Sequence, residues 1–138
     1  MKKIILVLLA AIVLTACQSK PTTGETVTVT GGSYKNVSAD ELNTMLKVKD
    51  FVFVNVHIPF EGNIANTDLS IPFDQISAPD NLSQLPADKN AEIILYCRSG
   101  RMSAIAAEEL VSLGYTNIWN LTGGMVDWEQ AGFEIQNK

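Results

Sequence analysis

Apolar residues fall in blocks along the chain that predict a set of buried strands. DFVFVNVH (residues 50–57) is an almost unbroken apolar run, and AEIILYC (residues 91–97) is a second one. Continuous apolar runs of this length are typical of parallel strands that are covered on both faces. LSIPF (residues 69–73) and YTNIWNLTGG (residues 115–124) predict two further short strands, of which the second leads into a turn. The pattern therefore indicates a sheet with parallel strands.

Helical signals separate these strands. Ser38 is followed three residues later by Glu41, which is the spacing of a capping box and predicts a helix over residues 39–47. Three further helices are predicted: a short one in residues 80–88 that stops at Pro86, one that starts near Ser103 and ends just before Gly114, and an amphipathic one within residues 124–135. Strands that alternate with helices define an α/β domain, here with a mostly parallel sheet and helices on both faces.

The first seventeen residues, MKKIILVLLAAIVLTAC, are set apart from the rest of the chain. The mostly apolar run after Lys3 is shorter than the roughly twenty residues that span a bilayer as a helix. We therefore interpret residues 1–16 as an export signal and not as a permanent anchor. The ending LTAC resembles the lipobox of bacterial lipoproteins, which implies that Cys17 is acylated and holds the chain on a bacterial membrane, facing the periplasm or the cell exterior. The alternative is an ordinary secreted protein with a free Cys17.

The segment that follows is rich in threonine, glycine and serine. We interpret residues 17–32 as the lipidated cysteine and a tether, and residues 33–138 as one domain, since the chain is short enough for a single core. ETVTVT (residues 25–30) alternates like a strand, so an ordered edge strand is the alternative for this part of the tether.

Charge and cysteine content exclude several functions. Loss of the signal peptide removes two lysines and leaves 8 Lys and Arg against 15 Asp and Glu, a formal charge of about −7. Such an acidic chain, with few clustered lysines, lacks the basic surface that binds nucleic acid. Its membrane attachment would come from the lipid and not from a basic patch. With Cys17 acylated, Cys97 has no partner in the chain for a disulfide. Cys97 and the lone His57 cannot supply the four ligands of a structural zinc site, so we expect no metal. We also expect no cofactor and a monomer.

Cys97 stands at the end of the most apolar predicted strand, where ligands lie in open α/β sheets. Residues 98–102 contain two arginines and a glycine and lead into the helix predicted from Ser103. Such a turn directs backbone N–H groups inward and adds the positive end of a helix dipole, an arrangement that stabilises an anion. Because the thiolate is the nucleophilic form of cysteine, we expect Cys97 to be a reactive nucleophile and not a buried structural residue.

The segment YCRSGRMSAIAAEELVSLGYTNIWNLTGGMVDWE (residues 96–129) resembles the active-site half of a rhodanese-like domain. The shared features are the cysteine that ends a strand, the loop over residues 97–102, the helix behind it and the later Gly-Gly and Trp. The resemblance implies a three-layer α/β fold and a sulfurtransferase. On this basis Cys97 would take sulfur from a small anionic donor such as thiosulfate, hold it as a persulfide and pass it to a thiol or to cyanide.

The resemblance also implies roles for the loop residues. The backbone N–H groups that would cradle the outer sulfur belong to Arg98, Ser99, Gly100, Arg101 and Met102. The two arginines would attract the anionic donor. Ser99 and Ser103 would bond within the loop or cap the following helix, and for Ser103 we prefer the capping role.

The chain departs from the family pattern at three positions. Asn55 stands where aspartate is usual, His57 where arginine is usual, and Met102 where many members have arginine. The resemblance therefore does not carry over a substrate preference. His57 is a candidate proton donor, with a packed histidine at a strand end as the alternative.

Two other functions remain as alternatives. Phosphatases and arsenate reductases related to rhodaneses place an arginine six positions after the cysteine, where this chain has Ser103, so a phosphoryl group would lack its bidentate clamp. A persulfide carrier that does not turn over, or an interaction module at the cell envelope, would have the same sequence features.

Overall fold

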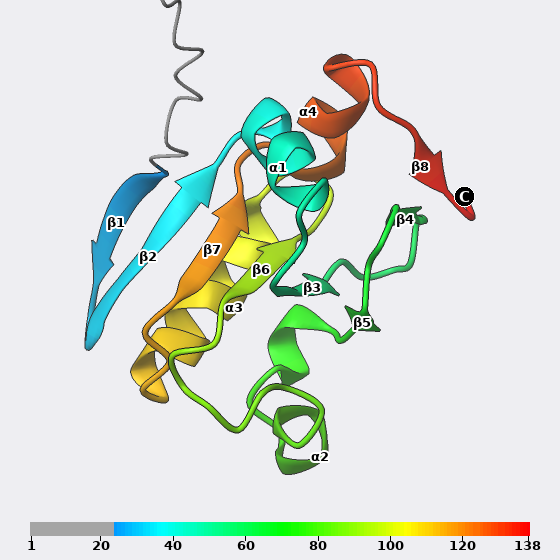
Figure 1. Ribbon diagram of the computed structural model, residues 1–138. Coiled ribbons are helices and arrows are strands. Elements are labelled where there is room, and N and C mark those ends of the chain that lie inside the picture. Colours follow the sequence, from blue (N-terminus) through cyan, green and yellow to red (C-terminus); the bar gives the residue numbers. More distant parts are fainter. Residues whose placement is uncertain (1–23) are drawn as a thin grey trace, which may run out of the picture.

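The computed structural model describes residues 24–138, and the predicted signal peptide (1–16) and Cys17 lie outside them. Six strands form the central sheet in the order β1-β2-β7-β6-β3-β5 (Figure 1). Their bounds are β1 Glu25–Val29, β2 Gly32–Val37, β3 Val52–Asn55, β5 Leu69–Ser70, β6 Ile93–Tyr96 and β7 Ile118–Leu121. Only the β1–β2 pairing within this sheet is antiparallel. The prediction of a mostly parallel sheet is confirmed.

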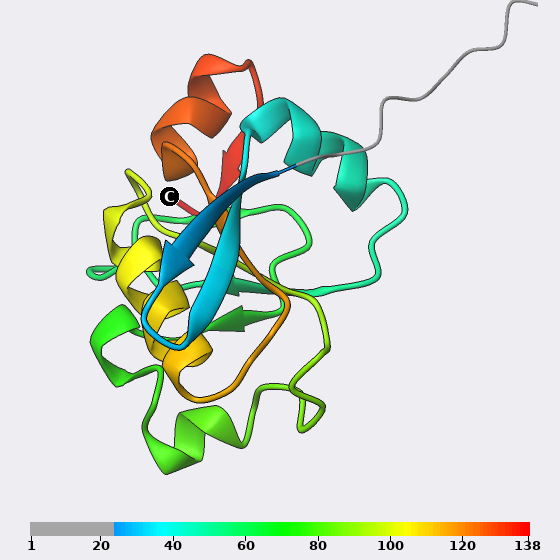
Figure 2. The same cartoon turned by 90° about the vertical axis from the view of Figure 1, so that its left-hand side faces the viewer.

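Helices cover both faces of this sheet. One face carries η1 (Phe73–Gln75), α2 (Pro79–Leu82) and α3 (Arg101–Ser112), and the other carries α1 (Ala39–Leu46) and α4 (Gly124–Gln130). Figure 2 views the sheet from its β1 edge, with α3 in yellow on one side and α1 in teal on the other. Each layer of helices buries its own cluster of apolar side chains against the sheet, so the three-layer α/β prediction is confirmed.

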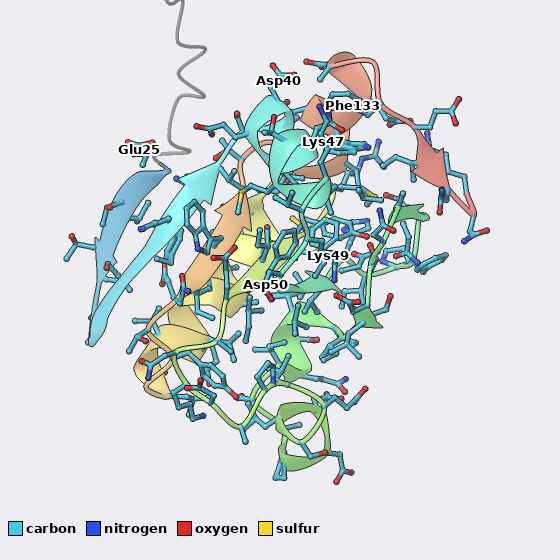
Figure 3. The ribbon with its side chains drawn as sticks, in the orientation of Figure 1. Glu25, Asp40, Lys47, Lys49, Asp50 and Phe133 are labelled. Carbon is cyan, nitrogen blue, oxygen red and sulfur yellow. The ribbon has the colours of Figure 1, made fainter. Side chains whose placement is uncertain are left out.

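The strand β6 explains why the sequence shows an unbroken apolar run. All four of its residues are buried, and neighbouring residues face opposite sides of the sheet. Leu95 contributes to the core beneath α3, and Tyr96 to the core beneath α1 and α4. The aromatic ring of Phe133, labelled in Figure 3, extends this second core, and its centroid lies 4.5 Å from that of the Trp128 ring.

The predicted capping box at the start of α1 is present. The Glu41 backbone N–H donates to Ser38 Oγ at 3.3 Å, and the Ser38 backbone N–H donates to Glu41 Oε2 at 2.9 Å. Both bonds satisfy N–H groups that a helix start would otherwise leave without a partner.

The interpretation of residues 25–32 as a tether is wrong. These residues form β1 and a turn into β2, and Val27 pairs with Tyr34 in the hairpin register. Alternation directs Val27 and Val29 toward the core beneath α3, while Gly31 turns the chain with a φ of +89°. The alternating pattern therefore outweighs the threonine-rich composition, and the edge-strand alternative describes this segment.

A second, two-stranded sheet was not predicted. It pairs β4 (Asn63–Ile64) with β8 (Ile135–Gln136) in antiparallel fashion, and it brings the chain after β3 close to the end of the domain. Ile64 stands alone among polar and small residues, and Ile135 falls at the end of the segment predicted as a helix, so neither strand gave a recognisable strand pattern. Across residues 24–138, no helix is long and apolar enough to cross a membrane.

Candidate active site

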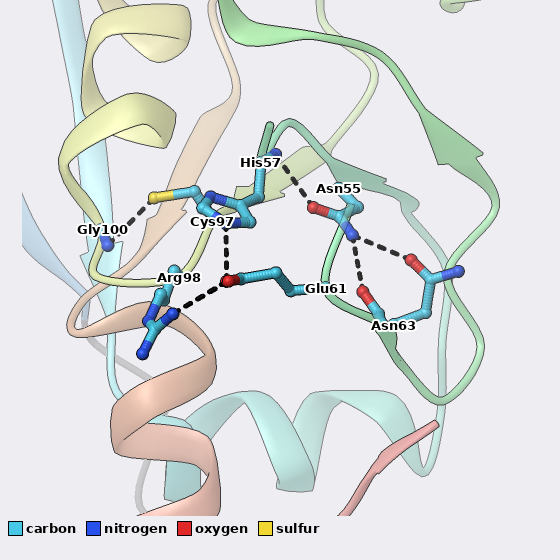
Figure 4. Close-up of polar contacts among 8 residues, drawn as sticks. Asn55, His57, Glu61, Asn63, Cys97, Arg98 and Gly100 are labelled. Atoms are coloured by element: carbon cyan, nitrogen blue, oxygen red, sulfur yellow. Dashed lines mark hydrogen bonds and ion pairs between the residues drawn. The ribbon is translucent and has the colours of Figure 1, made fainter. Parts of the chain in front are cut away.

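Cys97 follows β6 directly, and its side chain is almost fully buried, with 1% of its surface exposed. Its Sγ accepts a hydrogen bond from the Gly100 backbone N–H at 3.1 Å (Figure 4). It accepts another from Ser103 Oγ at 3.4 Å. One main-chain donor and one side-chain donor are therefore directed at the same sulfur.

Ser103 does not cap α3, so the preferred capping role is wrong. The helix begins at Arg101, two residues earlier than predicted, and the N-cap position belongs to Gly100. Gly100 adopts a φ of +90°, a left-handed conformation that favours glycine. The fully buried Ser103 instead lies in the first turn of α3, where its hydroxyl donates to the sulfur.

The rest of the loop presents unused hydrogen-bond donors. Among the described residues, five backbone N–H groups of the loop and the start of α3 donate to no protein acceptor, those of Arg98, Ser99, Arg101, Met102 and Ser103. The last three belong to the first turn of α3, where the helix itself offers no acceptor. N–H groups at a helix start bind anions well, because the helix dipole adds positive charge at the same end.

The first turn of α4 fixes the orientation of this loop. The Met125 backbone N–H donates to Cys97 O at 2.9 Å, and the Val126 backbone N–H donates to Arg98 O at 3.0 Å. In a trans peptide the C=O and N–H groups point in opposite directions. Because α4 holds these two carbonyls, the N–H groups of Arg98 and Ser99 point away from α4.

Glycine is required where α4 meets the loop. Gly124 has a φ of +55°, and a Cβ there would lie 2.3 Å from Cys97 O. Gly100 packs against the same junction, since a Cβ on it would lie 3.0 Å from the Gly123 backbone nitrogen. The Gly-Gly pair noted in the sequence therefore allows two backbone segments to approach more closely than any side chain would permit.

Arg98 makes an ion pair that sequence reasoning missed. Its Nη1 donates to Glu61 Oε1 at 2.9 Å and to Oε2 at 3.1 Å, and His57 Nε2 lies 2.8 Å from the same Oε2 (Figure 4). Burial acts to raise the pKa of Glu61, but the hydrogen bond with His57 and the charge of Arg98 outweigh it and hold that pKa below its usual value. The only sequence signal for this carboxylate is its spacing of four residues from His57.

Asn55 organises the segment that carries Glu61. Its Oδ1 accepts a hydrogen bond from the His57 backbone N–H at 3.0 Å, and its Nδ2 donates to Gly62 O and to Asn63 Oδ1, each at 2.9 Å. The asparagine is buried at the end of β3, so these bonds tie the segment to the sheet. His57 is thus a strand-end histidine with one nitrogen on Glu61, while its Nδ1 is buried without a partner in the described chain.

The remaining predicted loop residues differ in exposure. Arg101 and Ser99 are exposed, and Met102 packs partly against the core beneath α3. Among the described residues, no carboxylate lies within ion-pair distance of Arg101. The predicted loop residues therefore lie together, but their two arginines differ: Arg98 is paired with Glu61, whereas Arg101 has no carboxylate partner among the described residues.

A cavity of about 430 Å³ opens beside the loop. Glu61 and Arg98 form part of its wall, together with the apolar side chains of Phe60, Met125, Val126 and Ile135. In residues 24–138, no three side chains of His, Cys, Asp or Glu are grouped to hold a metal ion.

Comparison with known proteins identifies the class. The Rhodanese-like domain family matches residues 38–131, and the chain belongs to this family. A prokaryotic membrane lipoprotein lipid attachment site matches residues 1–18.

Individual relatives agree with this assignment. A sulfurtransferase from Allochromatium vinosum is 33% identical over 90 residues, which cover 63% of this chain and 79% of the relative. A tRNA uridine(34) hydroxylase from Erwinia tasmaniensis is 29% identical over 107 residues, which cover 75% of this chain but only 30% of the hydroxylase. The crystal structure of a rhodanese-like domain protein from Staphylococcus aureus has a TM-score of 0.60 and 36% identity, and the match covers 75% of this chain and 99% of that one.

Gly124→Ala tests whether the approach of α4 orients the loop. We expect it to lower the free energy of unfolding by about 3 kcal/mol or more and to slow alkylation of Cys97 by iodoacetamide, because the new Cβ collides with Cys97 O. Urea titration and intact-mass kinetics measure the two effects.

Gly114→Ala is the matched control, since Gly114 also has a positive φ, +92°, but nothing lies within 4 Å of its Cβ position. It should cost about 1 kcal/mol through strain alone and leave alkylation unchanged. Equal effects of the two substitutions on alkylation would show that the contact with α4 does not orient the loop.

Proposed function

We propose that this domain is a sulfurtransferase that moves sulfane sulfur from a donor such as thiosulfate to a thiol or to cyanide through a persulfide on Cys97. One observation carries the proposal: Cys97 Sγ lies among converging donors, two of which already contact it at 3.1 and 3.4 Å. The sulfurtransferase from Allochromatium vinosum, 33% identical, supports the same reaction class.

The first half-reaction loads the cysteine. The Cys97 thiolate attacks the outer sulfur of thiosulfate and forms a new S–S bond. The S–S bond of thiosulfate breaks, and its electron pair leaves with sulfite. The terminal sulfur of the persulfide then carries the negative charge, which the loop N–H groups that have no protein acceptor in the described chain would stabilise.

The second half-reaction releases the sulfur. Cyanide or a thiolate attacks the terminal sulfur, the persulfide bond breaks, and its electron pair returns to Cys97. The products are thiocyanate or an acceptor persulfide. The chain has two cysteines, of which Cys97 is the one in the described domain, and Cys17 is assigned to the lipid. The acceptor must therefore come from outside the chain.

A persulfide carrier that does not turn over is the second candidate. The observation in its favour is the burial of Cys97, with 1% of the residue exposed, which restricts access to the sulfur. The alternative of a phosphatase or arsenate reductase has less support, since the group six positions after the cysteine is the Ser103 hydroxyl and not a guanidinium.

The proposed place of action is the outer side of a bacterial membrane. The lipid attachment site over residues 1–18 supports export followed by anchoring through Cys17, with the domain facing the periplasm or the cell exterior. A monomer suffices for the proposed chemistry, because one chain supplies the cysteine and its donors.

Acylation of Cys17 is tested by mass spectrometry of the protein from membranes. We expect a mature chain that begins at a diacylated Cys17, and Cys17→Ser should move the protein out of the lipid-anchored fraction. A chain that keeps Met1, or that begins at an unmodified Cys17, would end this part of the proposal.

Cys97→Ser tests the nucleophile. The parent protein should gain one sulfur per chain after incubation with thiosulfate, and further turnover should scale with added cyanide or thiol. The serine variant should show neither, because a hydroxyl is a far poorer nucleophile toward sulfur. Intact mass and thiocyanate formation measure the two steps, and circular dichroism checks the fold. Transfer by the variant at the parent rate would rule out Cys97, whereas loading without turnover in the parent protein would favour the carrier.

Arg101→Gln tests capture of the anionic donor. We expect KM for thiosulfate to rise about tenfold with a smaller change in kcat, since a charge-assisted contact contributes about 1–2 kcal/mol. Lys47→Gln is the control, because Lys47 is exposed at the end of α1, outside the loop (Figure 3). Equal KM values for the two variants would assign donor capture to groups other than Arg101.

A further inference from the structure

The Glu61 carboxylate is held from two sides beside the loop over residues 97–102. Both of its oxygens accept from Arg98 Nη1, and Oε2 also contacts His57 Nε2 at 2.8 Å. The side chain of His57 is only 8% exposed, and its backbone N–H is bonded to the buried Asn55. The carboxylate is therefore fixed to the sheet through His57 and cannot leave Arg98 without breaking a second contact.

This charged pair lines a cavity beside the loop that follows Cys97. The side chain of Arg98 is 61% exposed and that of Glu61 is 38% exposed, and both line the cavity of about 430 Å³. The hydrogen bond with His57 and the charge of Arg98 keep the pKa of Glu61 low against its partial burial, so the carboxylate stays ionised at neutral pH. The positive charge that Arg98 presents to an incoming anion is therefore balanced by the negative charge of Glu61.

We propose that Glu61 is a specificity-determining residue that occupies Arg98 and so disfavours doubly charged sulfur donors relative to singly charged ones. The preferred donors are then sulfane compounds of one negative charge, such as thiosulfonates or organic persulfides. The physical reason is that the Coulomb energy of a fixed carboxylate with a ligand grows in proportion to the charge of that ligand. The choice of donor class rests on the proposed sulfurtransferase function. The charge effect of Glu61 on anion binding does not.

A binding measurement isolates the charge effect from turnover. Sulfate, a dianion that cannot donate sulfane sulfur, is titrated by calorimetry into the full-length Cys97→Ser protein at constant ionic strength. Addition of Glu61→Gln should tighten sulfate binding about five- to tenfold, because the guanidinium is released and one repelling charge is lost. Unchanged sulfate affinity would overturn the proposal.

Glu109→Gln is the matched control for the change of net charge. Glu109 is exposed on α3, and its carboxylate makes no hydrogen bond or ion pair with the described residues. It should leave sulfate affinity within about twofold. If Glu109→Gln tightened binding as much as Glu61→Gln, a global charge effect would replace the proposal. If Glu61→Gln did not fold, as judged by circular dichroism, Glu61→Ala must give the same result.

Donor kinetics test the specificity itself. For thiosulfate, a dianion, Glu61→Gln should raise kcat/KM about five- to tenfold, and for methanethiosulfonate, a monoanion, about two- to threefold. Equal gains for the two donors would show that Glu61 acts on loop structure and not through charge, which would overturn the proposal. If the parent protein accepted sulfur from neither donor, the proposed function would fail, and the sulfate titration would still decide whether Glu61 neutralises Arg98.

Discussion

Two backbone hydrogen bonds determine the orientation of the loop over residues 97–102. They run from Met125 N–H to Cys97 O and from Val126 N–H to Arg98 O. They hold the loop carbonyls on α4 and so turn the N–H side of the same peptides away from it. The distances require glycine at position 124, where a Cβ would collide with Cys97 O. Main-chain contacts therefore orient the loop after Cys97, and the buried Ser103 hydroxyl adds a side-chain donor to the sulfur.

The sheet order makes this contact possible. β6 and β7 are parallel neighbours, so the loop after β6 and the helix after β7 begin at the same edge of the sheet. The strand on the other side of β6 is β3, and the segment after it carries Glu61 to the same edge. Three neighbouring strand ends thus supply Cys97, the support for its loop and the carboxylate that pairs with Arg98.

The parts of this arrangement that sequence predicts are local ones. Cys97 and its loop are recognisable because a strand end, a glycine and a helix start are adjacent in the chain, and the Ser38 capping box depends on residues three apart. Glu61 escaped prediction because its partner Arg98 lies 37 residues away in the chain. Ser103 was misassigned for a similar reason: its spacing fits a cap, but the left-handed Gly100 starts the helix earlier and turns the hydroxyl toward the sulfur. A pattern of neighbouring residues does not show which group, distant in the chain, forms a hydrogen bond or ion pair with a given side chain.

The balance of charges indicates what kind of anion the loop holds best. The chain carries a formal charge of −5, and one of the two loop arginines is neutralised by Glu61, so stabilisation of an anion at the sulfur falls mainly to fixed backbone dipoles. Such dipoles are already oriented and need no reorganisation when charge appears. In the proposed mechanism, such dipoles would suit the single charge on the terminal sulfur of a persulfide more than the two charges of a free oxyanion. The loop would then hold the loaded sulfur more strongly than the donor that delivers it, as the proposed transfer requires.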